Sequence, residues 1–158
     1  MVGKIISGGQ TGVDRAALDF ALESGIPCGG WCPRGRRAED GPIPEAYPLK
    51  ETPAPVYPQR TAWNVRDSDG TLILTRGGLS GGTALTEKKA KAIGMPHWIV
   101  DMDGEADIVG TRAWLRQNRV EVLNVAGPRE SENLGIHDQA LAFLRALRPE
   151  SVVHTVVE

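Results

Sequence analysis

Short apolar runs alternate with stretches of helical periodicity along most of the chain. The apolar runs predict strands at 4–7, 71–74, 97–100 and 121–125, and a weaker strand at 28–31, where two glycines lower the propensity. Apolar residues recur at helical spacing over about 14–24, 83–93, 106–117 and 132–147, which predicts four helices. A further strand, at an edge of the sheet, is expected over 151–157.

Strands that alternate with helices predict βαβ units, which build a parallel sheet with right-handed crossovers. We therefore expect an α/β protein: one Rossmann-like domain over residues 1–158, with a mostly parallel sheet of about five or six strands and helices on both faces. No internal repeat and no break in composition divides the chain.

The segment 31–60 lacks clear periodicity and contains seven of the 11 prolines. Thirty residues without periodic structure are unusual inside a compact domain. Because the segment is also dense in arginine and acidic residues, we interpret it as an ordered functional loop over one end of the sheet. A solvated linker is the alternative interpretation.

Composition narrows the possible functions. The formal net charge is −2, with 41% hydrophobic residues, and the sequence contains two cysteines. The chain therefore lacks the overall positive charge of a nucleic-acid-binding protein, and no apolar run approaches the roughly 20 residues of a membrane span. We expect a soluble cytoplasmic protein with neither nucleic-acid nor membrane partners, and without a disulfide scaffold.

Three loops with unusual chemistry follow predicted strands: 7–15, 76–83 and 126–131. Ligands of open α/β sheets bind at the carboxyl ends of the strands, and glycines let backbone amides approach anionic oxygens there. The loops match neither the dinucleotide-binding nor the P-loop pattern. We expect a phosphate-bearing ligand. The alternative is that the glycines serve only tight turns and close packing.

The segment after the second strand adds Trp31, Arg34, Arg36 and Arg37. Guanidinium groups and an indole could hold an anionic heteroaromatic ligand through bidentate hydrogen bonds and stacking. The alternative is a solvated basic turn that pairs with nearby acidic residues. Thr83, at the start of a predicted helix, could either cap that helix or bind a phosphate.

Several motifs together resemble the molybdenum cofactor carrier family, over about residues 3–135. They are GGQTGVDRAA at 8–17, GWCP at 30–33, RAEDG at 37–41, RT at 60–61, NV at 64–65, DSD at 67–69 and GGT at 81–83. That family is part of a wider group of Rossmann-like proteins, which includes the "lonely guy" phosphoribohydrolases.

The resemblance implies a non-catalytic protein that binds, stores and transfers the molybdenum cofactor, or binds molybdate. It also implies a homo-oligomer, a dimer or tetramer, with molybdoenzymes or cofactor-biosynthesis proteins as partners. The expected site has no catalytic residue and no assigned metal ligand, and it comprises Gly8, Gly9, Gln10, Thr11, Gly12, Asp14, Arg15, Trp31, Arg34, Arg36, Arg37, Arg76, Gly78, Ser80, Gly81, Gly82 and Thr83.

An enzyme or sensor acting on a nucleotide or nucleoside phosphate is the alternative. The phosphoribohydrolases have a catalytic glutamate three residues after a Gly-Thr pair. Alignment of that pair with Gly82 and Thr83 puts Thr86 at the glutamate position and Glu87 one residue out of phase. One residue is about 100° on a helix, so Glu87 is expected on a different face. This departure favours binding over hydrolysis.

Overall fold

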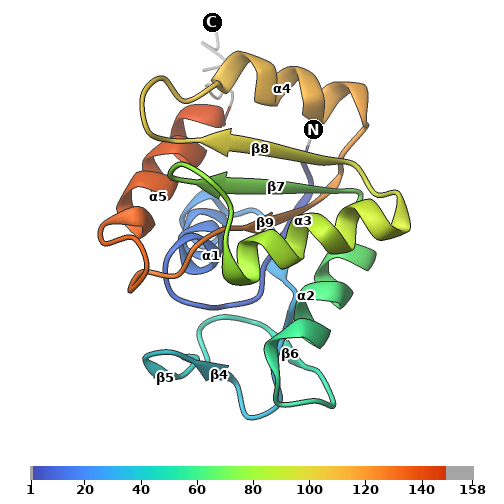
Figure 1. Ribbon diagram of the computed structural model, residues 1–158, viewed down its shortest axis with the longest axis vertical. Coiled ribbons are helices and arrows are strands. Elements are labelled where there is room, and N and C mark those ends of the chain that lie inside the picture. Colours follow the sequence, from blue (N-terminus) through green and yellow to red (C-terminus); the bar gives the residue numbers. More distant parts are fainter. Residues whose placement is uncertain (1, 149–158) are drawn as a thin grey trace, which may run out of the picture.

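The computed structural model describes residues 2–148, and its centre is a five-stranded parallel sheet. The strand order is β2-β1-β9-β7-β8 (Figure 1). The strands are β1 (Lys4–Ile6), β2 (Cys28–Gly29), β7 (Gly70–Thr75), β8 (His97–Asp101) and β9 (Val122–Ala126). The expected parallel sheet is confirmed; the strand expected at 151–157 lies outside the described residues.

Two groups of helices sandwich the sheet. α1 (Val13–Ser24) and α4 (Ile108–Gln117) both pack on α5 (Ile136–Leu147), whereas α2 (Tyr57–Arg66) packs on α3 (Gly81–Ile93). Alternate residues of β7 explain the two layers: Leu72 and Leu74 join the core cluster of the first group, and Ile73 is buried without joining it. The expected α/β fold with helices on both faces is therefore confirmed. Among the described residues, none of the helices has the length and apolar character that crossing a bilayer requires.

The strand expected at 28–31 is interrupted at Gly30. Gly30 has φ +124°, and a side chain there would lie 2.8 Å from the amide nitrogen of Ser7. The chain turns at this close approach, so β2 ends at Gly29 and β3 (Trp31–Cys32) pairs instead with β6 (Lys50–Glu51) in a second small sheet. The continuous strand was therefore a wrong prediction.

The segment 31–60 contains more regular structure than its sequence predicted. Besides β3 and β6 it forms an antiparallel hairpin of β4 (Arg37–Ala38) and β5 (Gly41–Pro42), which lies at the lower end of the molecule in Figure 1. Its last residues begin α2, which the sequence analysis did not predict. Proline in the first turn, at Pro58, is compatible with a helix because the missing N–H would have no partner there.

The sequence predicted the starts of α4 and α5 a few residues too early. α5 begins at Ile136 rather than near 132, because Gly135 takes a left-handed conformation (φ +83°) immediately before it. α4 begins at Ile108, where the side chain of Asp107 accepts a hydrogen bond from the amide of Gly110.

Candidate functional site

The three glycine-containing loops meet at one edge of the sheet. β1, β9 and β7 are neighbours, so the loops after them share the carboxyl edge of three adjacent strands. A cavity of about 270 Å³ lies there, between these loops, α2 and the start of α3. Its lining consists of Gly8, Gln10, Asp14, Tyr57, Pro58, Arg60, Thr61, Asn64, Gly81, Gly82, Thr83, Leu85, Thr86, Asn124, Val125, Ala126, Gly127, Pro128, Arg129 and Glu132.

The glycines of these loops fall into two kinds. A side chain at Gly8 would overlap the guanidinium of Arg60, and one at Gly12 would come 2.8 Å from the amide nitrogen of Glu130. By contrast, a side chain at Gly81 or Gly82 would meet nothing within 4 Å. The glycines of the first loop therefore allow close packing, whereas Gly81 and Gly82 leave the backbone at the start of α3 accessible.

The start of α3 offers unsatisfied amide donors to the cavity. Its N-cap residue Ser80 makes no side-chain capping hydrogen bond. The first hydrogen bonds back to Ser80 come from the amides of Thr83 and Ala84, at 3.2 and 3.3 Å, so the amides of Gly81 and Gly82 precede them. Such a helix start favours an anion, because exposed amides and the helix dipole both present positive charge. Thr83 does not cap this helix.

Asp14 and Arg60 form a buried acid–base pair in the cavity wall. A guanidinium nitrogen of Arg60 donates to the carbonyl oxygen of Gly8 at 2.8 Å and lies 3.5 Å from Asp14 Oδ2. Burial raises the pKa of Asp14 to about 6, and the charge of Arg60 and the hydrogen bond from the Gln10 amide offset this only in part. The cavity therefore contains a carboxyl group that titrates close to neutral pH.

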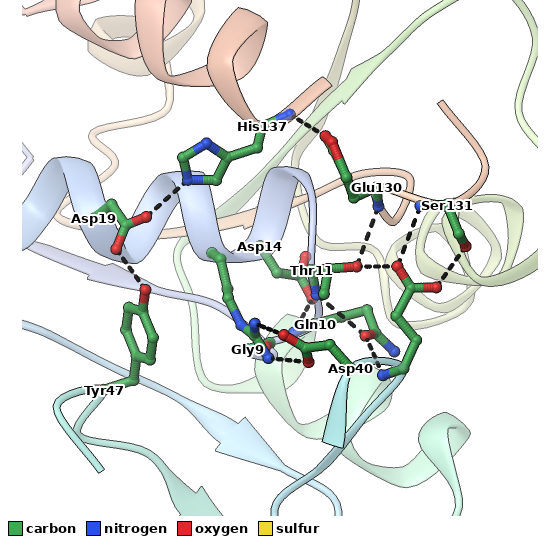
Figure 2. Close-up of polar contacts among 12 residues, drawn as sticks. Gly9, Gln10, Thr11, Asp14, Asp19, Asp40, Tyr47, Glu130, Ser131 and His137 are labelled. Atoms are coloured by element: carbon green, nitrogen blue, oxygen red, sulfur yellow. Dashed lines mark hydrogen bonds and ion pairs between the residues drawn. The ribbon is translucent and has the colours of Figure 1, made fainter. Parts of the chain in front are cut away.

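Gln10 faces the cavity with an unused donor. Its side-chain oxygen accepts hydrogen bonds from the amides of Thr11 (3.1 Å) and Glu39 (2.8 Å), which fixes the orientation of the side-chain amide (Figure 2). Gln10 is only 4% exposed, and its Nε2 has no hydrogen-bond partner among the described residues. A buried donor without a partner costs free energy, so this atom favours a ligand with an acceptor.

Arg129 contributes a second guanidinium, which is held less tightly than that of Arg60. It lies 3.3 Å from Glu132, and its side chain is 32% exposed. The guanidinium groups of Arg129 and Arg60 are 5.5 and 5.2 Å from the ring centre of Tyr57. The cavity thus combines an aromatic ring with two cations, which suits a ligand that has both a planar and an anionic part.

Six residues of the predicted site line this cavity, and they come from the first and second glycine loops. They are Gly8, Gln10, Asp14, Gly81, Gly82 and Thr83. Four others, Gly9, Thr11, Gly12 and Arg15, lie in the first loop or at the start of α1 but not in the cavity lining.

The remaining predicted residues lie away from the cavity lining. Arg36 donates to carbonyl oxygens of its own segment, including those of Pro44 (2.8 Å) and Tyr47 (2.9 Å). The indole N–H of Trp31 donates to Asp67 at 2.8 Å. A ligand role stays a prediction for the four first-loop residues named above and for the seven other predicted residues outside the lining, which are Trp31, Arg34, Arg36, Arg37, Arg76, Gly78 and Ser80.

Sequence reasoning missed the contribution of α2. Tyr57, Arg60, Thr61 and Asn64 line the cavity but were not among the predicted site residues. Their spacing places them on one face of a helix, and this periodicity was the available signal. Thr86 also lines the cavity, whereas Glu87 pairs with Lys91 and lies outside the lining, as its phase on the helix indicated.

A second depression lies beside the first loop, on its α1 and α5 side. Asp19 accepts a hydrogen bond from the hydroxyl of Tyr47 and contacts His137 Nε2, both at 2.7 Å (Figure 2). Burial and the neighbouring Asp19 raise the pKa of Tyr47 to about 12. Burial lowers the pKa of His137, but the carboxylates of Asp138 and Asp19 outweigh it and raise the pKa above its ordinary value. These groups satisfy one another, and we assign the depression no ligand.

The fold and this cavity define the chain as a Rossmann-like protein with a glycine-bordered cavity at the carboxyl edge of its sheet. The model of the circularly permutated YpsA SLOG family matches residues 5–148, and the chain belongs to that family. No curated protein matches the chain.

A solved structure supports the same relationship. The crystal structure, at 1.45 Å, of a protein from Syntrophus aciditrophicus SB is similar to this chain, with 45% sequence identity and a TM-score of 0.89. The similarity covers 94% of this chain and 96% of the other, whose provisional name is molybdenum carrier protein. The resemblance found in the sequence is thereby confirmed.

Proposed function

We propose that the chain binds the molybdenum cofactor as cargo and holds its phosphate in the cavity at the start of α3. The principal supporting observation is the buried side-chain amide of Gln10: this residue lines the same cavity as the uncapped helix start, and its Nε2 has no partner in the described part of the chain. The Gln10 amide in the first loop and the amides at the start of α3 thus both favour acceptor oxygens in the cavity, and a phosphate provides such a group.

The size of the cavity sets how much of the cofactor it accepts. Small-molecule sites commonly have volumes of about 300–1,000 Å³. A cavity of about 270 Å³ suits a phosphate and an adjoining part of the pterin, with the remainder lying outside. Tyr57, flanked by Arg60 and Arg129, is the ring on which a planar pterin would rest.

The described residues offer the metal no cluster of protein ligands. Within residues 2–148 there is no group of three or more histidine, cysteine or acidic side chains placed to bind a metal ion. Cys32 is fully buried, and burial raises the pKa of its thiol, which disfavours the thiolate form. We therefore propose that molybdenum keeps the dithiolene of the cofactor as its ligand while the protein holds the organic part.

Reconstitution tests this proposal. The purified protein is mixed anaerobically with cofactor released from a molybdoenzyme, and the molybdenum and pterin that elute with the protein are measured. We expect both to bind in equal amounts, and Arg129→Ala to reduce binding at least tenfold because it removes a guanidinium from the cavity. Arg145→Ala is the matched control, since Arg145 pairs with Glu23 outside the cavity. Equal binding by both variants would contradict the proposal.

A nucleoside phosphate is a second candidate ligand, and Asp14 is the observation that favours it. A carboxyl group with a pKa of about 6, beside a cation and in a cavity with anion donors, is suited to donate a proton to a leaving nucleobase. Asp14, rather than Thr86, would then be the general acid. In hydrolysis the bond between base and sugar would break, and the base would leave with the Asp14 proton. The hydroxyl of a water molecule would bond to the sugar carbon, and the remaining proton of that water would return to Asp14.

Chromatography of reaction mixtures separates the two candidates. The protein is incubated with each common nucleoside 5′-monophosphate, and release of the free base is measured at pH 5.5–7.5. Base release by the wild type, and none by Asp14→Asn, would establish the enzyme. The carrier proposal predicts no release by either protein, together with retention of the molybdenum cofactor.

A further inference from the structure

The carboxylate of Glu39, at the tip of the β4–β5 hairpin, is held by donors from two of the glycine-containing loops. Glu39 Oε1 accepts hydrogen bonds from the hydroxyl of Thr11 and, at 3.2 Å, from the amide of Ser131. Glu39 Oε2 accepts one from the hydroxyl of Ser131 at 2.5 Å, and Arg129 lies 4.0 Å away. Figure 2 shows Thr11, Glu130 and Ser131 gathered around this point.

This set of donors has the composition of an oxyanion site. It combines one backbone amide, two hydroxyls and a guanidinium, all directed at one pair of oxygens. Partial burial raises the pKa of Glu39, but the hydrogen bonds from Ser131 and Thr11 outweigh this and hold the pKa below its ordinary value. The surroundings therefore stabilise negative charge.

The oxyanion site adjoins the cavity described above through two shared residues. Arg129 lines the cavity and also lies next to the Glu39 carboxylate. Gln10 lines the cavity too, and its side-chain oxygen accepts a hydrogen bond from the backbone amide of Glu39. A ligand in the cavity that has a second anionic group could therefore reach the oxyanion site without passing through the core.

We propose that Thr11, Ser131 and Arg129 form a second oxyanion subsite, which the side chain of Glu39 fills until a ligand with two oxyanion groups displaces it. This inference rests on the proposed phosphate site at α3 and adds a requirement for a second anionic group. Glu39 acts as an internal competitor, so the apparent affinity of the subsite is reduced by the fraction of molecules in which Glu39 occupies it.

The hairpin has anchors that do not depend on the Glu39 carboxylate. Arg15 holds Asp40 through two hydrogen bonds, one of them 2.7 Å long. The amide of Ile43 donates to the carbonyl oxygen of Arg36 at 2.7 Å. Removal of the Glu39 side chain is therefore expected to leave the hairpin in place and to vacate the subsite.

Equilibrium dialysis with inorganic phosphate measures the number of sites directly. At phosphate concentrations too low to displace Glu39, we expect one phosphate per wild-type chain, in the cavity, and two per Glu39→Ala chain. Glu45→Ala is the matched control, because Glu45 is an exposed acid of the same segment, and it is expected to bind one. The second phosphate of Glu39→Ala is expected to be lost again when Ser131→Ala is added.

One phosphate in both wild type and Glu39→Ala would overturn the subsite and leave the proposed function intact. No phosphate in the wild type but one in Glu39→Ala would support the subsite and contradict the phosphate site at α3. No phosphate in either would refute both.

A measurement on the wild type does not depend on how the variant folds. Hydrogen exchange of the amides at 37–42 is followed with and without inorganic phosphate at concentrations that fill a weak site. If phosphate displaces Glu39, exchange at the hairpin tip increases at least threefold. Unchanged or slower exchange at saturating phosphate would overturn the subsite.

Discussion

Substitution of Asp14 by asparagine tests whether burial of this carboxyl group costs stability at neutral pH. Asp14 is 6% exposed and its nearest cation, Arg60, is 3.5 Å away. Its pKa is about 6 in the folded protein, compared with an ordinary value of 3.8. That difference corresponds to about 3 kcal/mol of free energy, because one pKa unit is about 1.4 kcal/mol.

The direction in which pH changes the free energy of unfolding follows from where the Asp14 proton is bound. Between pH 3.8 and about 6 the folded protein holds the Asp14 proton while the unfolded chain has released it. The free energy of unfolding must therefore fall as pH rises through this window, and stay lower above it. The asparagine side chain of the Asp14→Asn variant does not titrate, so the stability of this variant relative to wild type should increase by about 2 kcal/mol from pH 4 to pH 7.5, because part of the full difference lies below pH 4.

Urea unfolding between pH 4 and pH 8 measures this difference. The high pKa of His137 changes stability at higher pH in both proteins, so the comparison isolates Asp14. Asp40→Asn is a control that should destabilise the fold. The hydrogen bond from Arg15 lowers the pKa of Asp40, so the charged carboxylate stabilises the fold at pH values above its ordinary pKa, and the substitution removes that stabilisation. Parallel curves for wild type and Asp14→Asn would refute the assignment of a raised pKa.

Three further substitutions test the packing and the polar contacts around the site. Gly127→Ala should destabilise the fold by about 1–3 kcal/mol in thermal unfolding, because the new methyl would overlap the Leu74 carbonyl oxygen; Gly78→Ala, in open space, should not. Tyr47→Phe should cost about 1–2 kcal/mol in urea unfolding, because it removes the 2.7 Å hydrogen bond to a carboxylate. Gln10→Glu, nearly isosteric, should weaken phosphate binding at least tenfold by calorimetry, because it replaces the unpaired donor with a negative charge.

Local sequence order is enough to place some of the expected site residues at the cavity. Gly81 and Gly82 come after a buried strand and begin a helix, and this local order alone places them at the carboxyl edge of the sheet. Local sequence order does not show whether an arginine in the expected ligand-binding segment is free to bind a ligand. Arg36 lies in the segment expected to bind ligand, yet backbone carbonyl groups of that segment take up its donors.

The sequence by itself determined the parallel sheet, the helices α1, α3, α4 and α5, and the edge at which the glycine loops meet. The periodicity of strands and helices depends on residues only a few positions apart, so a single amino-acid sequence is enough to predict these elements. Only the tertiary structure decided that Arg60 and Arg129 border the cavity and that Gln10 retains an unpaired donor. Those outcomes depend on contacts between residues far apart in the chain, such as the 46 positions between Asp14 and Arg60, and periodicity contains no information about such contacts.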